Sequence, residues 1–329
     1  MREKESISGF STPASAAAAQ FASDVQYYLA LRPRQLPSRY LYNALGSALF
    51  DAICHLPWYP ITRAELRLLT AHGREIFAHV PGLSTLVELG PGSGEKLIAL
   101  VEAGRVAASH LHLDLIDVSP TALALAGRAL AALDNVEIDL HEASYEAGLL
   151  EVTAQRRTTG RTLTLFLGSN IGNFDRPGAD AFLLGMHAAL RRGDALLLGA
   201  DLVKPEPDLV RAYDDPLGVT AAFNRNLLLR INRELGGNLD VAQFAHRAVW
   251  NAPESRVEMH LVSLHRQIVR VDAAGLEFTM EQGESIWTES SYKYEPAGIV
   301  DMLRRAGFGL VNQWIDRANG FALTLVEAL

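Results

Sequence analysis

The chain has 329 residues, of which 49% are hydrophobic, and its formal net charge is −8 at pH 7. This length provides hydrophobic cores for one large domain or two ordinary ones. The negative charge, without any basic run, disfavours a nucleic-acid substrate, because little is available to neutralise phosphates. The single cysteine, Cys54, excludes an intrachain disulfide framework and cysteine-rich zinc sites, and we expect it to be a small buried residue.

The first segment of the chain, residues 1–15, is charged and then rich in serine and alanine. It lacks the apolar core of a secretion signal, and we expect it to be flexible. No stretch of about 18 apolar residues is present, so the sequence predicts no membrane span. We therefore expect a soluble cytoplasmic protein, acting as a monomer on a small molecule and not on nucleic acid or a membrane.

Short helices are predicted before the first strand, over residues 16–31, 46–56 and 62–79, with an extended loop over 34–42. The apolar spacing in 46–56 is typical of a helix packed along one face. Thr62, followed three residues later by Glu65, has the spacing of a capping box at the start of the third helix.

Strands and helices then alternate through the middle of the chain. Predicted strands cover residues 86–89, 112–118, 136–140, 163–167 and 195–199. One intervening helix has Ser119 as its cap and Pro120 in its first position, and another covers residues 180–190. This alternation predicts a parallel sheet with helices on both faces, which is a Rossmann-like, doubly wound α/β fold.

The alternation ends after residue 201. Helices are predicted over 208–212 and 220–235, and strands over 256–264, 267–271 and 276–280. A helix over 296–307 and two strands, 310–314 and 321–326, complete the chain, with Asn319-Gly320 as a hairpin turn. We expect residues 64–201 and 294–329 to form the Rossmann-like domain, and residues 16–63 and 202–293 to form a second, α+β substrate-binding domain.

The first strand of the predicted sheet runs into a glycine-rich loop. Gly90, Gly92 and Gly94 allow backbone conformations and close approaches that a side chain would prevent. The spacing lacks the third glycine of a dinucleotide fingerprint. Glu88 before the turn favours S-adenosylmethionine (SAM), which has no phosphates and carries a positive sulfonium. A glycine turn without a ligand remains the alternative.

Polar residues follow two further predicted strands at the same edge of the sheet. Asp117 ends the second strand, where a carboxylate can accept both hydroxyl hydrogens of a ribose; the alternative is an acid favoured by the dipole of the next helix. The fourth strand runs into Gly168-Ser169-Asn170-Ile171-Gly172-Asn173. The carboxyl edge of an open α/β sheet is where ligands bind, so this loop is a candidate for substrate binding.

Glu289 and Ser291 are two residues apart and share one face if their segment is extended. A carboxylate beside a hydroxyl can bind a group with two N–H donors, such as an imidazolium, although an ordinary surface strand remains the alternative. No histidine has the spacing of a His-Glu-x-x-His site, so we expect no metal.

These pieces together resemble the SAM-dependent histidine Nα-methyltransferases of ergothioneine biosynthesis. The resemblance covers nearly the whole chain from about residue 30. The segments that carry it are residues 42–51, 62–65, 87–90, 166–173, 196–204, 211–215, 218–226 and 288–291. The sequence departs from the family pattern at Pro60, at Ser144-Tyr145 and at Asn170.

The resemblance implies a methyltransferase domain that binds SAM and a second domain that covers the amino acid, and it assigns residues by group. Tyr42 and Tyr59 line the reacting amine. The implied substrate-binding residues are Phe50, Tyr59, Gly168, Asn173, Tyr213, Met259, Glu289 and Ser291. The implied cofactor-binding residues are Glu88, Gly90, Gly92, Lys96, Asp117, Ser144 and Tyr145.

The expected reaction is methyl transfer from SAM to the α-amino nitrogen of histidine, repeated to the trimethylated betaine hercynine, with S-adenosylhomocysteine as the other product and no metal. Two alternatives remain open. One is the same chemistry on another aromatic amino acid, such as tryptophan or tyrosine. The other is a non-catalytic SAM-binding protein.

Overall fold

The computed structural model describes residues 13–104, 110–156 and 159–329. Contacts within the chain divide it into two compact units. Unit 1 consists of Met1–Leu41, Ala221–Arg247 and Met259–Glu289, and unit 2 consists of Tyr42–Thr220, Ala248–Glu258 and Ser290–Leu329. The domain boundaries expected from the sequence stay a prediction.

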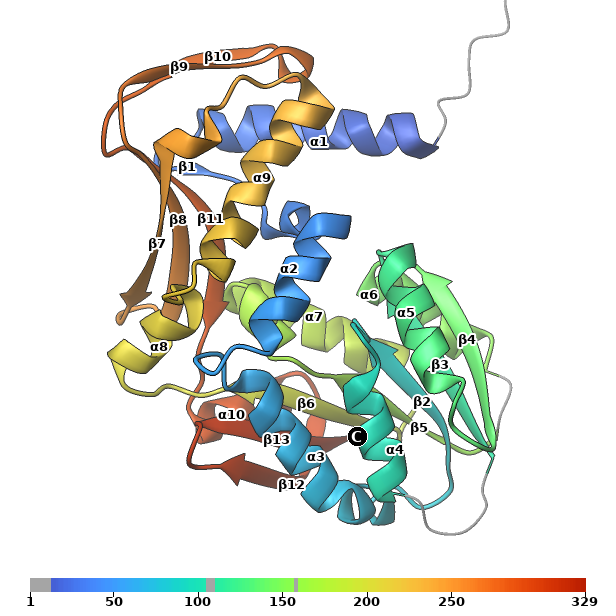
Figure 1. Ribbon diagram of the computed structural model, residues 1–329. Helices are drawn as coiled ribbons and strands as arrows, with labels where there is room; N and C mark the ends of the chain where they lie inside the picture. Colours follow the sequence, from blue (N-terminus) through green and yellow to red (C-terminus); the bar gives the residue numbers. More distant parts are fainter. Residues whose placement is uncertain (1–12, 105–109, 157–158) are drawn as a thin grey trace, which may run out of the picture. The chain divides into compact units, whose positions relative to one another are not determined.

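Unit 2 is built on one seven-stranded sheet (Figure 1). Its strands, in spatial order, are β12 (Phe308–Asp316), β13 (Phe321–Ala328), β6 (Ala195–Asp201), β5 (Arg161–Phe166), β2 (Leu83–Leu89), β3 (Leu111–Asp117) and β4 (Val136–Glu142). The five strands from β6 to β4 are parallel, whereas β13 pairs antiparallel with β6 and β12 pairs antiparallel with β13. The predicted doubly wound α/β fold is therefore confirmed, with an antiparallel hairpin at one edge.

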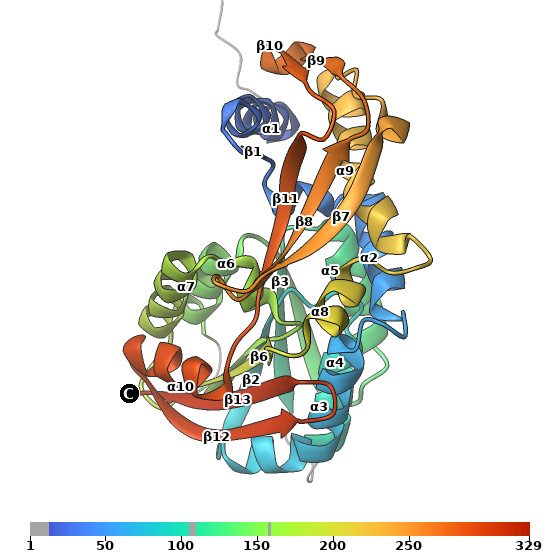
Figure 2. The same cartoon turned by 90° about the vertical axis from the view of Figure 1, so that its left-hand side faces the viewer.

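Helices cover both faces of this sheet, as Figures 1 and 2 show from two directions. One face carries α3 (Ile61–Ala78), α4 (Glu95–Gly104) and α5 (Pro120–Leu130). The other face carries α6 (Tyr145–Ala154), α7 (Arg176–Ala189) and α10 (Pro296–Arg305). The shorter elements α2 (Ala44–Cys54), η2 (Asn170–Asn173) and α8 (Glu206–Tyr213) also belong to unit 2.

The central strands are apolar on both sides because helices bury both faces. Between the sheet and α6, α7 and α10, the core includes Val87, Phe166, Phe182 and Ile299, each at most 4% exposed. This packing holds the parallel strands rigidly, so their carboxyl ends are fixed relative to one another.

Unit 1 contains most of the remaining elements. They are α1 (Pro13–Ala30), β1 (Arg34–Gln35), η1 (Ser38–Leu41), α9 (Val219–Leu235), η3 (Val241–Gln243), β7 (Phe244–Asn251), β8 (Arg256–Ser263), β9 (Gln267–Val271), η4 (Asp272–Ala274), β10 (Leu276–Met280) and β11 (Ser285–Tyr292). One sheet has the order β1-β11-β8-β7, and β9 and β10 form an antiparallel pair (Figure 2). The last residues of β7 and β11 and the first of β8 belong to unit 2.

Several local predictions are confirmed by the structure. Ser119 caps α5 by accepting a hydrogen bond from the N–H of Ala122 at 3.2 Å, with Pro120 in the first position. The two last strands form the predicted hairpin. No helix among the described residues is long and apolar enough to cross a membrane.

Other local predictions are wrong or incomplete. The capping box at Thr62 and Glu65 does not form, because α3 begins one residue earlier, behind Pro60, and has no side-chain cap. The extended loop over 34–42 contains β1 and η1, and α6 and β7 had not been predicted. Cys54 is only partly buried. Of the segment expected to be flexible, residues 1–12 lie outside the described residues and 13–15 begin α1.

Candidate active site

The glycine loop connects β2 to α4 with three residues in the left-handed region. Gly90, Gly92 and Gly94 have φ of 76°, 55° and 81°, which a side chain would strain. A Cβ on Gly90 would lie 2.8 Å from the hydroxyl of Tyr145 and 3.3 Å from the amide nitrogen of Asn170. The loop thus meets residues that follow β4 and β5, at the carboxyl edge where the sequence predicted a ligand.

Glu88 is the acidic residue just before this loop, and it is 1% exposed. Its Oε2 atom has no hydrogen-bond partner among the described residues. Burial raises the pKa of Glu88 to about 8, and the neighbouring Lys96 ammonium only partly opposes this effect. A buried carboxyl group with an oxygen that has no hydrogen-bond partner is suited to binding a positively charged ligand.

Lys96 is paired with a residue that the sequence had assigned to a different task. Its Nζ lies 2.6 Å from Oε2 of Glu65, whose side chain is completely buried. The N–H of Gly168 donates to both oxygens of Glu65 at 2.9 and 2.8 Å. Burial works to lower the pKa of Lys96, but Glu65 outweighs it and the pKa is raised. Glu65 therefore fixes both Lys96 and the loop after β5.

This contact explains why Gly199 of β6 has no side chain. A Cβ there would lie 2.0 Å from Oε1 of Glu65, far inside van der Waals contact. The same loop is anchored on its other side by Ser169, whose hydroxyl accepts the N–H of Asp201 at 2.9 Å. Glu65 was missed as a site residue because its partners come from β5 and α4, remote in sequence.

The other predicted cofactor residues lie near the loop in different ways. Asp117 ends β3 and accepts the N–H of Ser119 at 2.8 Å; burial raises its pKa, while backbone hydrogen bonds oppose the shift. Ser144 is the cap of α6, accepting the N–H of Ala147 at 3.4 Å. Tyr145 packs edge-on against Phe166 at 5.5 Å between ring centroids, and burial raises the pKa of its phenol.

Four aromatic residues predicted for the substrate side form a continuous row in unit 2. The ring centroids are 5.5 Å apart for Tyr42 and Phe50, 6.3 Å for Phe50 and Tyr59, and 6.1 Å for Tyr59 and Tyr213. Each pair packs edge to face, which is a favoured arrangement. Burial raises the pKa of Tyr59 well above its usual value, so its phenol stays protonated at neutral pH.

The row ends in a hydrogen-bonded network around a completely buried lysine. Nζ of Lys293 donates to the hydroxyls of Tyr213 and Ser291 at 2.7 and 2.9 Å. The Tyr213 hydroxyl donates to that of Ser291 at 2.8 Å. Nζ also lies 2.9 Å from Oδ2 of Asp201. Lys293 and Asp201 were not predicted, although Lys293 continues the two-residue spacing of Glu289 and Ser291.

Asp201 forms an ion pair with a second lysine through its other carboxylate oxygen. Nζ of Lys204 lies 2.6 Å from Oδ1 of Asp201 and donates to the carbonyl of Asn319 at 2.8 Å. Asp201 is 2% exposed. One carboxylate is therefore shared by two ammonium groups, and the network carries a net positive charge. Such a charge is suited to an anionic group of a ligand.

The loop that contains Asn173 is held against the segment after β11. Gly172 leaves room for the carbonyl of Tyr292, which a Cβ would approach to 2.7 Å. The Tyr294 hydroxyl donates to the carbonyl of Ile171 at 3.1 Å. Asn173 itself is exposed at the end of η2. The loop before Asn173 is therefore in contact with the residues that follow Ser291, and a shared site for Asn173 and Ser291 stays a prediction.

The two remaining predicted residues, Met259 and Glu289, belong to unit 1. Met259 is 2% exposed on β8, and its carbonyl accepts the hydroxyl of Thr288 at 3.0 Å. Glu289 lies on β11 two residues before Ser291, so both side chains leave the strand on the same side. This segment is extended, which is the condition that the sequence prediction had set.

Comparison with known proteins identifies the chain's relatives. The family model described as "Histidine-specific methyltransferase, SAM-dependent" matches residues 21–328. A histidine N-alpha-methyltransferase of Mycolicibacterium smegmatis is 42% identical over 95% of this chain and 96% of its own length. One of Mycobacterium tuberculosis is 43% identical over 92% of this chain and 93% of its own.

A more distant relative is named for a different substrate. The 4-dimethylallyltryptophan N-methyltransferase of Epichloe festucae var. lolii is 26% identical over 87% of this chain and 88% of its own length. The chain belongs to the family of histidine-specific, SAM-dependent methyltransferases.

Proposed function

We propose that the chain methylates the α-amino nitrogen of L-histidine three times, to give hercynine and three molecules of S-adenosylhomocysteine. The observation that carries this proposal is the network in which Lys293 joins Tyr213, Ser291 and Asp201. Its net positive charge matches the α-carboxylate that every free amino acid carries. Family membership supports histidine as the amino acid.

The cofactor site fits SAM because the structure leaves a buried acid there. Glu88 has an oxygen without a partner, and Gly90 leaves space between Tyr145 and Asn170. We assign Glu88, Gly90, Gly92, Lys96 and Asp117 to this site, with Tyr145 beside it and Ser144 acting through the cap of α6. When bound, SAM supplies an electrophilic methyl group on a positively charged sulfur.

The protein's own residues position the amine and accommodate its charge. Alignment of two reactants can contribute roughly 7–11 kcal/mol to the barrier reduction. Tyr42, Tyr59 and Phe50 surround the amine in this proposal, and their ring faces attract the cationic nitrogen that methylation produces. The raised pKa of Tyr59 means that it relays a proton as a neutral phenol and does not take one up as a phenolate.

Recognition of the side chain is assigned to Glu289, Ser291 and Met259. A carboxylate and a hydroxyl on one side of β11 offer an acceptor and a second polar group to the two nitrogens of an imidazole. Asn173 and Tyr213 are assigned to the amino and carboxylate groups, and Gly168 to backbone contact. We also propose that the enzyme works in the cytoplasm as a monomer, without nucleic acid.

The first experiment offers the enzyme SAM and a panel of free amino acids, with products identified by mass spectrometry. The proposal expects a gain of three methyl groups on histidine, through one- and two-methyl intermediates. Methylation of tryptophan or tyrosine with histidine untouched would refute the choice of substrate. Absence of any methylated product, with SAM binding intact, would favour a non-catalytic binding protein.

A second experiment tests how histidine is recognised. Glu289→Ala should weaken histidine binding by more than about tenfold, because an imidazole N–H loses a charged acceptor, while SAM affinity should change little. Glu281→Ala is the matched control, since Glu281 is an exposed acid of the same unit. Equal losses of histidine and SAM affinity in Glu289→Ala would place Glu289 outside the imidazole site.

A further inference from the structure

A second group of polar side chains lies in unit 2, on neighbouring strands β3 and β4. His112 and Asp114 of β3 and Asp139 and His141 of β4 form a mirrored pattern, His-x-Asp beside Asp-x-His. Asp114 and Asp139 are direct partners in the parallel register. All four side chains leave the same face of the sheet, because side chains alternate along a strand.

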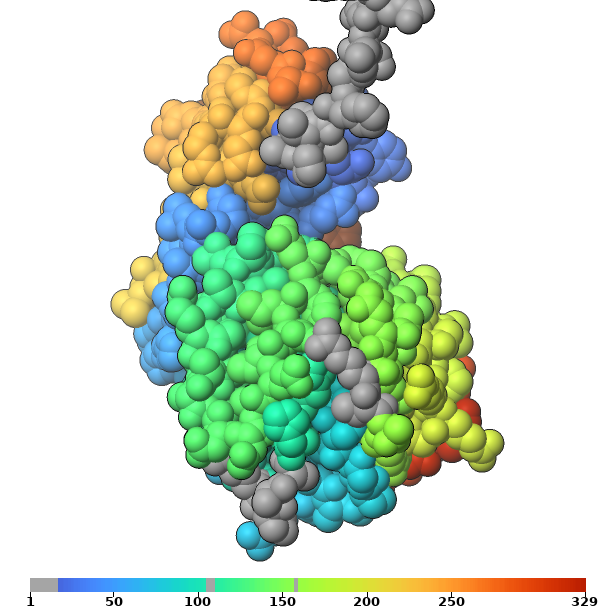
Figure 3. Space-filling view, turned by 90° about the vertical axis from the view of Figure 1, so that its right-hand side faces the viewer, coloured from blue at the N-terminus to red at the C-terminus, as the bar shows by residue number. Residues whose placement is uncertain are grey.

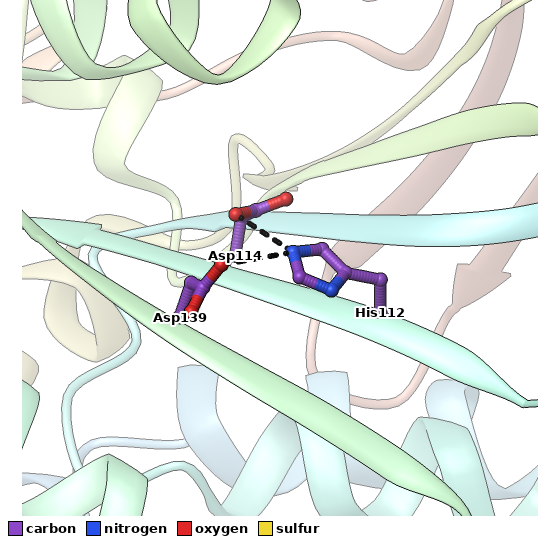
Figure 4. A group of neighbouring side chains, drawn as sticks. All are labelled: His112, Asp114 and Asp139. Carbon is purple, nitrogen blue, oxygen red and sulfur yellow. Dashed lines mark ion pairs between the residues drawn. The ribbon is translucent and has the colours of Figure 1, made fainter. Parts of the chain in front are cut away.

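The ligating atoms of this group converge. Nε2 of His112 lies 3.3 Å from Oδ1 of Asp114 and 3.3 Å from Oδ2 of Asp139. Nε2 of His141 lies 2.8 Å from the same Oδ1 of Asp114. Figure 4 shows the His112 ring directed at both carboxylates. One ligand atom each from His112, Asp114 and Asp139 lie within 4.8 Å of one another.

Hydrogen bonding alone explains this geometry poorly. One Nε2–H cannot donate well to two carboxylates at once, and 3.3 Å is beyond the usual 2.7–3.2 Å range of an N–H···O bond. The same separation is the ligand-to-ligand edge of a tetrahedral zinc site, about 3.3 Å for metal–ligand bonds of about 2.0–2.1 Å. The side chains of His112 and Asp114 are only 8% and 6% exposed, and two carboxylates within 4.8 Å of each other repel unless a cation lies beside them.

The cluster is open to a hollow, and among the described residues no unpaired cation lining it competes with a metal ion. The four residues line a hollow together with Thr85, Thr162 and the end of α6. Arg156 also lines this hollow, but its charge is taken up by Asp194 at 2.6 Å. Glu137 lies 3.6 Å from Nδ1 of His112, too far for a hydrogen bond, and adds a negative charge on the other side of the ring. Strand β4 lies at the edge of the sheet, on the side that Figure 3 shows in green.

We propose that His112, Asp114 and Asp139 bind a divalent zinc-type ion that clamps β3 to β4, with His141 hydrogen-bonded to Asp114 beside the site. One imidazole with two carboxylates, and a fourth position open to water, is a donor set that zinc accepts. Asp117, at the cofactor edge, lies three residues beyond Asp114 on β3, which is about 10 Å along a strand. The ion is therefore structural and takes no part in methyl transfer. Spacing rules for a single helix do not detect it, because its ligands come from two strands.

The test is metal binding by the full chain after treatment with a chelator. Titration with Zn²⁺ alone, followed by calorimetry and by metal analysis after dialysis, should give one ion per chain and a rise in Tm. Co²⁺ in its place should give the visible absorption of a tetrahedral site. His112→Gln and Asp139→Asn should each weaken Zn²⁺ binding by more than about tenfold, since each removes a ligand.

His265→Gln is the matched control, because His265 is exposed and remote in sequence from the cluster. It should bind Zn²⁺ as the unaltered chain does. If His112→Gln does not fold, Asp139→Asn decides the matter, because the Asp139 side chain is 33% exposed and tolerates change better. Absence of saturable binding, or unchanged binding in Asp139→Asn, would overturn the proposal.

Discussion

Unit 2 holds two lysines at the carboxyl edge of its sheet, Lys96 partly buried and Lys293 completely buried. Their charged partners differ in number and sign. Lys96 has two acids near it, Glu65 in direct contact and Glu88 as a further charge. Lys293 has the reverse arrangement, because its acid Asp201 is shared with Lys204. With all groups ionised, the first cluster has a net charge of −1 and the second a net charge of +1.

The difference matches the two ligands of the proposed reaction. A cluster with one acid too many attracts the sulfonium of SAM, and a cluster with one base too many attracts the carboxylate of an amino acid. One edge of the sheet can therefore bind a cation at the first cluster and an anion at the second, and the charges disfavour binding in the reverse arrangement. Substitutions in either cluster test this comparison.

The largest effect is expected from Lys293→Met. Removing this ammonium leaves Asp201 with one lysine and takes a donor from Tyr213 and Ser291. Removing one partner of a buried charge pair between a protein and its ligand costs about 2–5 kcal/mol of binding free energy, so kcat/KM for histidine should fall by about 100-fold. SAM affinity, measured by calorimetry, should change by less than about threefold.

Lys204→Met is the control for Lys293→Met, since Lys204 pairs with the other oxygen of the same carboxylate. It should lower kcat/KM much less. Histamine, which lacks the carboxylate, supplies a second comparison: the penalty for histamine relative to histidine should shrink in Lys293→Met. An undiminished penalty would mean that Lys293 does not act on the carboxylate.

Glu65→Gln should lower the free energy of unfolding by about 3 kcal/mol, measured by urea denaturation. The completely buried carboxylate holds Lys96 and accepts the N–H of Gly168, and a neutral amide would leave the lysine unpaired. Glu102→Gln, on an exposed position of α4, should change stability by less than about 0.5 kcal/mol. Equal stability of both variants would contradict a structural role for Glu65.

Glu88→Gln should weaken SAM binding by about tenfold at pH 8.5 and less at pH 6.5. With a pKa of about 8, Glu88 is largely protonated at pH 6.5 and gains its negative charge as the pH rises. SAM affinity of the unaltered chain should therefore increase between pH 6.5 and 8.5. Glu88→Gln should lose this increase, and a parallel pH dependence in both proteins would exclude Glu88 as its source.

The same group predicts a change in stability in the absence of ligand. A carboxyl whose folded pKa is about 8, against 4.5 for an ordinary glutamate, binds more protons in the folded state between these values. Its contribution to stability is thus present at low pH and lost as the pH rises through that window. Tm should fall less from pH 5 to pH 8 in Glu88→Gln than in the unaltered chain.

The last effect is expected from Tyr59→Phe, and it is confined to kcat. Tyr59 is 6% exposed and its ring packs between those of Phe50 and Tyr213, so the packing survives the loss of the hydroxyl. A lost relay should reduce kcat by about 10- to 100-fold at most, with SAM affinity unchanged. The Tyr59 phenol stays protonated in the unaltered chain, so it is not the group that takes up the proton. The rate of Tyr59→Phe should therefore still fall at low pH, which is the acidic limb of the pH–rate profile. Loss of that limb would make Tyr59 the base.

Much of the fold could be predicted because the decisive patterns are local. Apolar runs gave the strands β2, β3 and β5, and Ser119-Pro120 marked the start of α5. Each of these signals lies within a few residues of the structure it specifies. The glycine loop and the two-residue spacing of Glu289 and Ser291 were visible for the same reason.

The parts that failed depend on contacts between distant segments. Thr62 and Glu65 have the spacing of a capping box. Glu65 instead points into the core, because it pairs with Lys96 and accepts the N–H of Gly168 there. The local preference of a residue for a helix cap is overridden when its buried charge has a partner, because leaving that charge unpaired costs more free energy than losing the cap. The helix α6, which Ser144 caps, was not predicted either.

The sequence by itself determined the class of fold, the edge of the sheet at which the glycine loop lies and the four residues of the aromatic row. Only the tertiary structure decided how the buried charges are shared: Glu65 with Lys96, Asp201 with two lysines, and two strands with one cluster of histidines and aspartates. The physical reason is that strand order and register bring these groups together, and neither is encoded in the spacing of neighbouring residues.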